Sequence, residues 1–437
     1  MATEWQAYDV SRLIEDGALL IGDGYRAKND ELSATGVPFA RAGNINDGFR
    51  FDDADHFPEA DLSRLGNKIS QPGDVVFTSK GTVGRFAFVR EGTARFVYSP
   101  QLCFWRSLDV TRIEPRFLFY WMFGREFFVQ FKGVAGQTDM AEYVSLGDQR
   151  RMRITLPPVS EQRAIAHILG TLDDKIEVNR RMSATLEAMA RALFKSWFVD
   201  FEPVRAKADG RDPGLPPHLA ALFPDRLVET EVGEVPEGWR LGTLAAYADL
   251  NPEVWSKRTR PEEIKYIDLS NAKWGHIETI TPHKRDDAPS RAQRVLRPDD
   301  TIVGTVRPGN GSFAFISEEG LTGSTGFAQL RPRSSNAAEF VYLAATSTDN
   351  IEALAHIADG AAYPAVQPEV VAATPAVTAP GRVVDAFAHH SRPLLGKIAQ
   401  NGAESRTLAA LRDALLPKLI SGKLRVKDAE RFLASAT

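Results

Sequence analysis

Cysteine is almost missing from this sequence, in which Cys103 is the only one among 437 residues. A single cysteine excludes an intrachain disulfide and a cysteine cage around a metal, so a reducing cytoplasm is the expected location. No cationic residue adjoins Cys103, and its neighbours Leu102, Phe104 and Trp105 are apolar. We therefore expect a buried strand here and a packing role for the thiol, because a reactive thiol needs cationic neighbours.

Long apolar runs are missing as well. No stretch reaches the ~20 apolar residues of a membrane-spanning helix. The acidic start MATEWQAYDVSRLIEDG has no apolar core of signal-peptide length. We therefore expect neither secretion nor a membrane partner.

An excess of positive charge is also missing, because 53 Lys and Arg face 57 Asp and Glu, which gives a formal charge of −4. This balance excludes a protein that coats nucleic acid through net charge alone. Any site for a polyanion has to be local.

Catalytic signatures are missing too. The sequence has neither a G-x-x-x-x-G-K-[ST] phosphate loop nor an H-E-x-x-H zinc motif. Glu263 and Lys265 have the E-x-K spacing of many nucleases, with Asp225 or Asp299 as conceivable partners at a magnesium site. Such tripeptides arise often by chance, so the sequence favours a non-catalytic chain.

The sequence does contain an internal repeat. The length of the whole chain, 437 residues, predicts two or three domains, since domains usually have ~100–200 residues. A constant shift of 222 residues aligns 158–193 with 380–415 without a gap, and 14 of these 36 positions are identical. Duplication is the simplest explanation.

The segments before these two stretches repeat more loosely, with a shift that falls from 227 to 223. PFARAGNINDG (38–48) aligns with KYIDLSNAKWG (265–275), and residues 99–106 align with 324–331. PGDVVFTSKGTVGRFAFV, from Pro72, aligns with PDDTIVGTVRPGNGSFAFI, from Pro298. Short runs rich in Val, Phe and Trp between Gly, Pro and Ser turns predict β-strands in both copies, at 74–77, 85–89, 102–105, 301–303 and 312–316.

The better preserved segments have the pattern of long amphipathic helices. Seam positions alternate spacings of 3 and 4 from Ile165 to Trp197 and from Phe387 to Leu419, as in a coiled coil. About 35–40 residues would make each helix ~50–60 Å long, and the shared period makes each the natural partner of the other. For Asn179 and Asn401, a register-setting role and a solvent-facing position both remain open. The residues expected to pack between the helices are Leu172, Ile176, Asn179, Leu186, Leu193, Leu394, Ile398, Asn401, Leu408 and Leu415.

These patterns predict an α+β fold with two β-rich units separated by two long helices. The expected boundaries are a first β-rich unit at 1–156, a helix at 157–200, a Pro- and Gly-rich connector at 201–234, a second β-rich unit at 235–380, and a second helix with its tail at 381–437.

Residues 157–201, PPVSEQRAIAHILGTLDDKIEVNRRMSATLEAMARALFKSWFVDF, resemble the central conserved region of specificity subunits of type I restriction–modification systems. The Pro-Pro-x-x-Glu-Gln entry to the helix is the most specific element, and the second helix departs from it with Ala379-Pro380-Gly381-Arg382. Other pieces agree in order, so that the resemblance covers essentially the whole chain: GNINDG (43–48), GDVVFTSKGTVG (73–84), VPEGWRLGTL (235–244), STGFAQLRP (324–332) and LPKLISGKLRV (416–426).

This resemblance implies two target-recognition domains, each reading one half of a split, asymmetric DNA site, held apart by two helices packed as an antiparallel coiled coil. It implies double-stranded DNA, two methyltransferase (modification) subunits and restriction subunits as partners. The chain itself would carry no catalytic residue, cofactor or metal, while S-adenosylmethionine, magnesium and ATP would be bound by its partners.

Polar and basic residues in the repeated loops are the candidates for DNA contacts, since Arg, Lys and Asn suit guanine, phosphate and adenine edges. Lys and Arg are also frequent at 80–116, next to an acidic stretch at 47–61, which fits one DNA-facing side or solvated surface charge. Asn44 and Asn271 are alternatively turn residues. The candidates are Arg41, Asn44, Lys80, Thr82, Arg85, Asn271, Lys273, Arg307, Asn310 and Ser312.

A second class of function remains open, namely a coiled-coil assembly scaffold whose β-rich units bind protein. A third is a standalone nuclease that uses Glu263 and Lys265. DNA binding with a sequence preference would favour the specificity subunit over the scaffold, and cleavage by the chain alone would favour the nuclease.

Overall fold

The computed structural model describes residues 5–429, except 47, 81–83, 136–143, 231–232, 257 and 361–362. The chain forms two compact units, of which the first comprises Met1–Lys175 with Leu408–Thr437 and the second comprises Ile176–Thr407. Both long helices pass through this division. Each unit therefore contains one end of each helix, and the boundaries between the units fall inside the helices.

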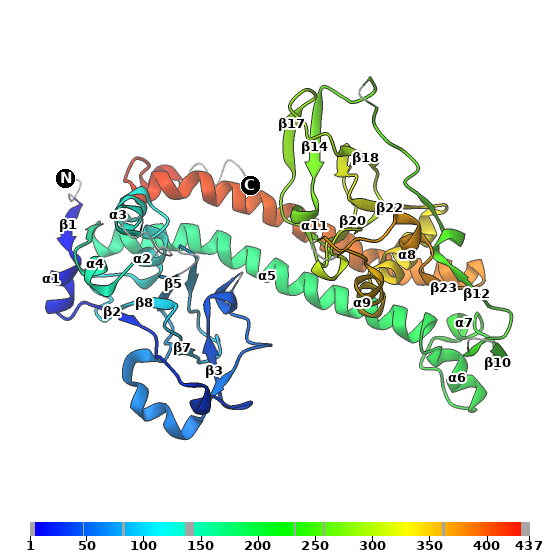
Figure 1. Ribbon diagram of the computed structural model, residues 1–437, viewed down its shortest axis with the longest axis horizontal. Coiled ribbons are helices and arrows are strands. Elements are labelled where there is room, and N and C mark those ends of the chain that lie inside the picture. The colour runs from blue at the N-terminus through cyan, green and yellow to red at the C-terminus, as the bar shows by residue number, and fades with distance from the viewer. Residues whose placement is uncertain are drawn as a thin grey trace. The chain divides into compact units, whose positions relative to one another are not determined.

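The two long helices are α5 (Val159–Phe198) and α11 (Gly381–Ile420), each with 40 residues, or ~60 Å. They lie side by side and antiparallel (Figure 1): Asp173 contacts Arg412 in the first unit, and Ser183 contacts Asn401 in the second. The expected antiparallel coiled coil is confirmed.

The first β-rich unit is built on small sheets. One antiparallel sheet has the order β2-β8-β5-β6, a second has the order β4-β3-β7 with β3 and β7 parallel, and β1 pairs with β9. The strands are β1 (Gln6–Asp9), β2 (Leu19–Asp23), β3 (Val37–Ala40), β4 (His56–Phe57), β5 (Val75–Thr78), β6 (Phe86–Phe88), β7 (Val97–Tyr98), β8 (Leu102–Ser107) and β9 (Arg153–Leu156).

The second β-rich unit repeats this plan. Its sheets have the orders β13-β22-β19-β20 and β17-β14-β21-β18, β14 and β21 are parallel, and β12 pairs with β23. It adds β18 and two hairpins, β10–β11 and β15–β16. The strands are β10 (Leu227–Thr230), β11 (Gly233–Pro236), β12 (Arg240–Thr243), β13 (Ala248–Leu250), β14 (Glu263–Ile267), β15 (Ala272–Lys273), β16 (His276–Ile277), β17 (Thr281–Lys284), β18 (Ala292–Leu296), β19 (Thr301–Gly304), β20 (Phe313–Phe315), β21 (Leu321–Ser324), β22 (Phe327–Pro332) and β23 (Pro375–Thr378).

Short helices inside the β-rich units were not expected from the sequence. All eight residues of α8 are buried, so no polar face gives this segment the amphipathic period of a surface helix. In the first unit these helices are α1 (Val10–Glu15), α2 (Pro115–Trp121), α3 (Arg125–Ala135) and α4 (Leu146–Arg150). In the second they are α8 (Ala338–Ala345), α9 (Thr348–Ile357) and α10 (Pro368–Ala372). The loops of the two units also contain short 3₁₀ helices, among them η2 (Ala42–Ile45), η5 (Leu269–Asn271) and η6 (Pro308–Asn310).

The connector at 201–234 is folded against the second unit. It contains α6 (Glu202–Ala208) and α7 (Pro217–Ala220) before β10 begins. Phe201 and Phe223 enter the core formed by the end of α5 and the second β-rich unit. The Phe201 ring lies against Trp239, and the Phe223 ring lies against Trp197. Pro203 and Pro217 lie in the first turns of α6 and α7, where the missing N–H of proline is not needed.

A buried aspartate–arginine pair holds the main sheet of each unit. Asp74 is fully buried and accepts hydrogen bonds from Arg106 Nε at 2.5 Å, Arg106 Nη2 at 2.7 Å and Tyr98 Oη at 2.6 Å. Asp300 is also fully buried and accepts from Arg331 Nε at 2.9 Å and Nη2 at 3.0 Å. Bidentate pairing is the geometry that offsets the cost of removing both charges from water.

Cys103 lies in β8 and is buried, with Gln149 Nε2 3.3 Å from its sulfur. Burial raises the pKa of this thiol. The expected packing role is confirmed.

Along the described stretches, no helix combines the length and apolar character needed to cross a membrane.

Candidate nucleic-acid interface

The residues expected between the long helices lie at or near their contact. Leu172 and Leu415 are buried in the core of the first unit, and Leu408 packs against that core. Leu193, Leu394 and Ile398 pack against the core of the second unit, and Ile176 and Leu186 are half-buried.

The middle of the seam is polar. Asn179 and Asn401 are each 1% exposed, so the solvent-facing position for these residues was the wrong alternative. The Asn179 Nδ2 group donates to Glu404 Oε2 at 2.8 Å and lies 3.4 Å from Ser405 Oγ, and Asn401 Nδ2 lies 3.3 Å from Ser183 Oγ. Each asparagine thus faces a serine of the opposite helix.

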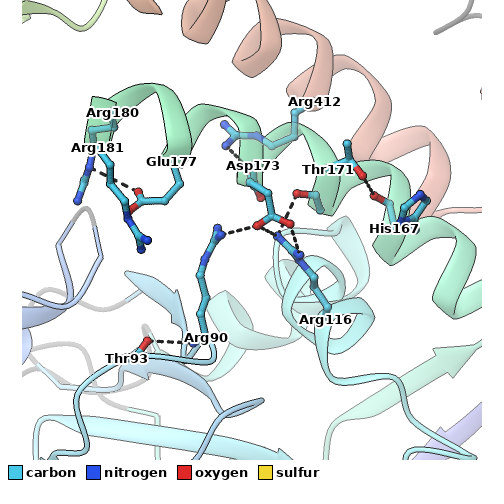
Figure 2. A network of polar contacts seen from close by, with 12 residues as sticks. Arg90, Thr93, Arg116, His167, Thr171, Asp173, Glu177, Arg180, Arg181 and Arg412 are labelled. Carbon is cyan, nitrogen blue, oxygen red and sulfur yellow. Dashed lines mark hydrogen bonds and ion pairs between the residues drawn. The ribbon is translucent and has the colours of Figure 1, made fainter. Parts of the chain in front are cut away.

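Two neighbouring aspartates of α5 fasten the first β-rich unit to the helix (Figure 2). Arg116 of α2 donates to both carboxylate oxygens of Asp174 at 2.7 Å, and Arg90 pairs with the same carboxylate. Asp173 accepts from Arg412 Nη1 at 2.8 Å (Figure 2), and it also accepts from Tyr120 Oη at 2.6 Å. The hydrogen bonds from Arg116 lower the pKa of Asp174, while burial and the Asp173 charge raise that of Tyr120.

Four of the cations in the basic stretch at 80–116 are paired with carboxylates of this chain. Arg90 and Arg116 are committed to Asp174, Arg106 to buried Asp74, and Arg112 to Asp16. Sequence composition could not separate these cations from exposed ones, because their acidic partners lie far away along the chain.

Asn44 and Asn271 have the same backbone role in the two units. Asn44 Oδ1 accepts from the backbone N–H of Arg41 at 2.7 Å, and Asn271 Oδ1 accepts from that of Asp268 at 3.2 Å. In both cases the asparagine is the third residue of a 3₁₀ helix, η2 or η5, and its side chain caps the N-terminal end of that helix. The turn interpretation describes what both amide oxygens do in this structure.

The other candidates of the first unit differ in whether a carboxylate lies beside them. Arg41 pairs with Asp55 at 2.6 Å, so its charge is already compensated. Lys80 is exposed, and Thr82 lies outside the described residues. Arg85, just before β6, donates from Nη1 to the Asn46 Oδ1 atom at 2.9 Å.

The remaining candidates of the second unit gather around η6. Lys273 Nζ lies 3.4 Å from the Oγ atom of Ser312, which is buried. Arg307 precedes η6 with a positive φ of 48°, and its guanidinium lies 5.0 Å from the ring centroid of Tyr363. Asn310 ends η6 and is exposed.

Sequence reasoning missed Trp274, which follows Lys273. Its side chain is 53% exposed and its backbone φ is 46°, a strained value for a bulky residue. The Trp274 N–H donates to Gly311 O at 2.7 Å, and a Cβ on Gly311 would lie 2.4 Å from the indole. The repeat alignment, which sets Trp274 opposite Asp47, gave no reason to select it.

Glu263 and Lys265, the residues of the nuclease alternative, lie on the exposed face of β14, opposite Lys284 and Pro282 of β17. Within the described ranges, no group of three or more His, Cys, Asp or Glu side chains is placed to hold a metal ion.

Comparison with known proteins gives consistent matches. Residues 18–188 match the profile of the type I restriction modification DNA specificity domain. The HindI specificity subunit of Haemophilus influenzae is 24% identical over 83% of this chain and 89% of its own length, and the MjaIX specificity subunit of Methanocaldococcus jannaschii is 20% identical over 83% and 80%.

The fold is shared with a solved structure. The S subunit of the type I restriction-modification system of M. genitalium superposes with a TM-score of 0.58 at 15% identity, covering 95% of this chain and 96% of its own. The profile match and the curated relatives indicate a type I restriction–modification specificity subunit, and the duplicated units and antiparallel helices agree with this.

Proposed function

We propose that this chain gives a type I restriction–modification complex its DNA specificity, each β-rich unit reading one half of a bipartite, asymmetric site. The observation that carries this proposal is the duplication of one sheet plan with diverged loops. Ala42, Gly43 and Arg85 of the first unit have Leu269, Ser270 and Ser312 as their counterparts in the second. Equivalent scaffolds with different exposed side chains suit two different half-sites.

The two helices would set the distance between the half-sites. A length of ~60 Å exceeds one turn of DNA, ~34–36 Å, so modules carried by such helices can address successive grooves on one face of a duplex. Methylation and cleavage would belong to modification and restriction subunits, which would bind S-adenosylmethionine, magnesium and ATP. The complex would act on double-stranded DNA in the cytoplasm.

The test starts from the methylated site, found by long-read methylome mapping in cells that carry the system. The chain with its modification subunits should bind a duplex with this site far better than one whose central spacer is changed by two base pairs. Equal binding of both duplexes would contradict the spacing role. Equal binding of a scrambled duplex at the same salt concentration would indicate the scaffold alternative.

An apolar strip on α5 supports docking of a modification subunit. Val178, Met182 and Met189 are 52%, 41% and 53% exposed. Their spacing of 4 and 7 residues places them on one helix face, where Val178, Met182 and Leu186 line a surface depression. Exposed apolar side chains that gather on one face are typical of protein-binding surfaces. The proposed occupant is an apolar helix face of the modification subunit.

The docking proposal is tested with two matched triple variants. Val178→Ser, Met182→Ser and Met189→Ser together should abolish co-purification with the modification subunit while the thermal midpoint stays unchanged. The control carries Val228→Ser, Val254→Ser and Ile357→Ser, three equally apolar residues exposed elsewhere in the second unit. Loss of assembly in both triple variants, or in neither, would refute the docking site.

A further inference from the structure

The same cationic contact occurs in both units, with its donor and acceptor exchanged. In the first unit, Arg85 donates to Asn46 at 2.9 Å. In the second, Lys273 approaches Ser312 at 3.4 Å. A shift of 227 residues aligns Asn46 with Lys273 and Arg85 with Ser312. In both units, the segment that follows the 3₁₀ turn η2 or η5 therefore meets the residue just before β6 or β20 through one cation. Arg85, just before β6, supplies it in the first unit, and Lys273, in β15, supplies it in the second.

The charge of these two cations is not compensated. The acceptors, an amide oxygen and a hydroxyl, are neutral, and neither Arg85 nor Lys273 forms an ion pair with a carboxylate of the described residues. Arg90, Arg106 and Arg116, which lie near Arg85 in the sequence, are all paired with aspartate. Of these five cations, Arg85 and Lys273 are the two that no carboxylate of the described residues neutralises.

The exchange preserves the charge but not the shape of the cation. A guanidinium presents a planar fork that reads guanine with two hydrogen bonds, whereas an ammonium acts as a point charge. A base contact would require a particular shape in each unit. A phosphate accepts either cation, and the phosphodiester backbone is the component that two different half-sites share.

We propose that Arg85 and Lys273 are equivalent phosphate contacts that fix each unit on the DNA backbone, while neighbouring exposed side chains such as Trp274 meet the groove. This inference rests on the proposed DNA-specificity function and deepens it. It assigns the pair to positioning on the duplex, so their removal should weaken binding to all sequences alike.

The experiment measures the salt dependence of binding of the full-length chain to a random-sequence duplex and to its target duplex. Arg85→Gln keeps hydrogen-bond donors for Asn46 but removes the charge, and Lys273→Gln does the same opposite Ser312. Each should lower the slope of log affinity against log salt by about 0.9, equivalent to about eightfold weaker binding at ~0.1 M salt. The double variant should lose about twice that slope, and the ratio of specific to random binding should stay unchanged.

Two further variants make the result decisive. Arg85→Lys, which restores a charge without the fork, should restore the slope. Arg12→Gln removes an exposed cation that pairs with Glu15 and Asp16 on α1 and should leave the slope as it is. An unchanged slope in Arg85→Gln and Lys273→Gln, or a loss confined to one base pair of the target, would overturn the phosphate contact. Absence of any sequence preference in the unaltered chain would instead overturn the proposed function.

Discussion

At the scale of single residues, the buried pairs Asp74–Arg106 and Asp300–Arg331 are the most demanding contacts of the two units. Removing one member leaves the other charge buried without a partner, which costs more than the pair itself contributes. Asp74→Ala is therefore expected to lower the free energy of unfolding by about 3–5 kcal/mol, measured by urea denaturation. Asp55→Ala breaks a pair whose side chains are both 48% exposed and should cost less than about 1 kcal/mol. Similar costs for both variants would contradict this account.

The Asp174 carboxylate gives the first unit a defined response to acid. Its pKa is lowered, mainly by the hydrogen bonds from Arg116, so it binds a proton less readily in the folded than in the unfolded chain. The stability that it contributes is present at neutral pH, above the unfolded pKa of about 4, and is lost as pH falls through the lower folded pKa.

Comparison with Asp174→Asn tests this sign. The difference in thermal midpoint between the unaltered chain and the variant should be constant from about pH 8 to 5 and shrink below about pH 4. A difference that grows on acidification would show that Asp174 is not the anionic partner of Arg116.

At the scale of elements, α11 is a weaker helix than α5. It contains Pro393, Gly396 and Gly402, where the repeat places Thr171, Asp174 and Arg180 in α5. Proline removes one backbone hydrogen bond and glycine adds freedom to the unfolded chain. Packing along the seam therefore holds α11 more than its own propensity does.

Replacing the glycines should stabilise the chain. A Cβ at Gly396 meets nothing within 4 Å, and one at Gly402 meets an Arg406 nitrogen at 3.7 Å. Gly396→Ala and Gly402→Ala should each add about 0.5–1 kcal/mol, seen as a higher thermal midpoint. Gly24→Ala should act in the opposite direction, because its Cβ would lie 2.0 Å from the Ser99 carbonyl oxygen.

The two β-rich units are attached to the long helices by ion pairs of reversed polarity: the first unit contributes the cation, and the second contributes the anion. In the first unit, Arg116, the second residue of α2, reaches Asp174 and the Gly170 carbonyl of α5. In the second unit, Glu339, the second residue of α8, accepts from Arg392 of α11 at 2.7 Å. The repeat aligns Gly170 with Arg392, so each helix carries a charge that suits its own unit and repels the other. This arrangement favours the pairing of each unit with its own helix.

Periodicity made the helices and the main strands predictable, because Ile165 to Trp197 and the strands around Val75 and Phe104 have local patterns that survive in a single sequence. The paired cations were not predictable in the same way. Arg106 looks like Arg85 in the sequence, and only the fold places Asp74 beside the former and leaves the latter without a carboxylate. Trp274 was missed for a related reason, since its exposure depends on a strained turn that no sequence pattern marks.

At the scale of the whole molecule, each β-rich unit has a core of its own, so each should change specificity by itself. Trp274→Ala is expected to alter discrimination only in the half-site read by the second unit, by about 1–3 kcal/mol at the affected base pairs. Competition between duplexes altered in one half at a time measures this. A change in the half-site of the first unit would contradict modular reading.

The polar centre of the coiled coil has a consequence for the origin of the chain. The 222-residue shift of the repeat aligns Asn179 with Asn401 and Ser183 with Ser405. The side-chain contacts join each asparagine to the serine of the other copy, Asn179 to Ser405 and Asn401 to Ser183. This reciprocity is the mark of an isologous, two-fold interface between identical subunits. The helix pair therefore has the geometry of a two-fold dimer interface inside one polypeptide, and each half of the repeat carries both the asparagine and the serine of the contact.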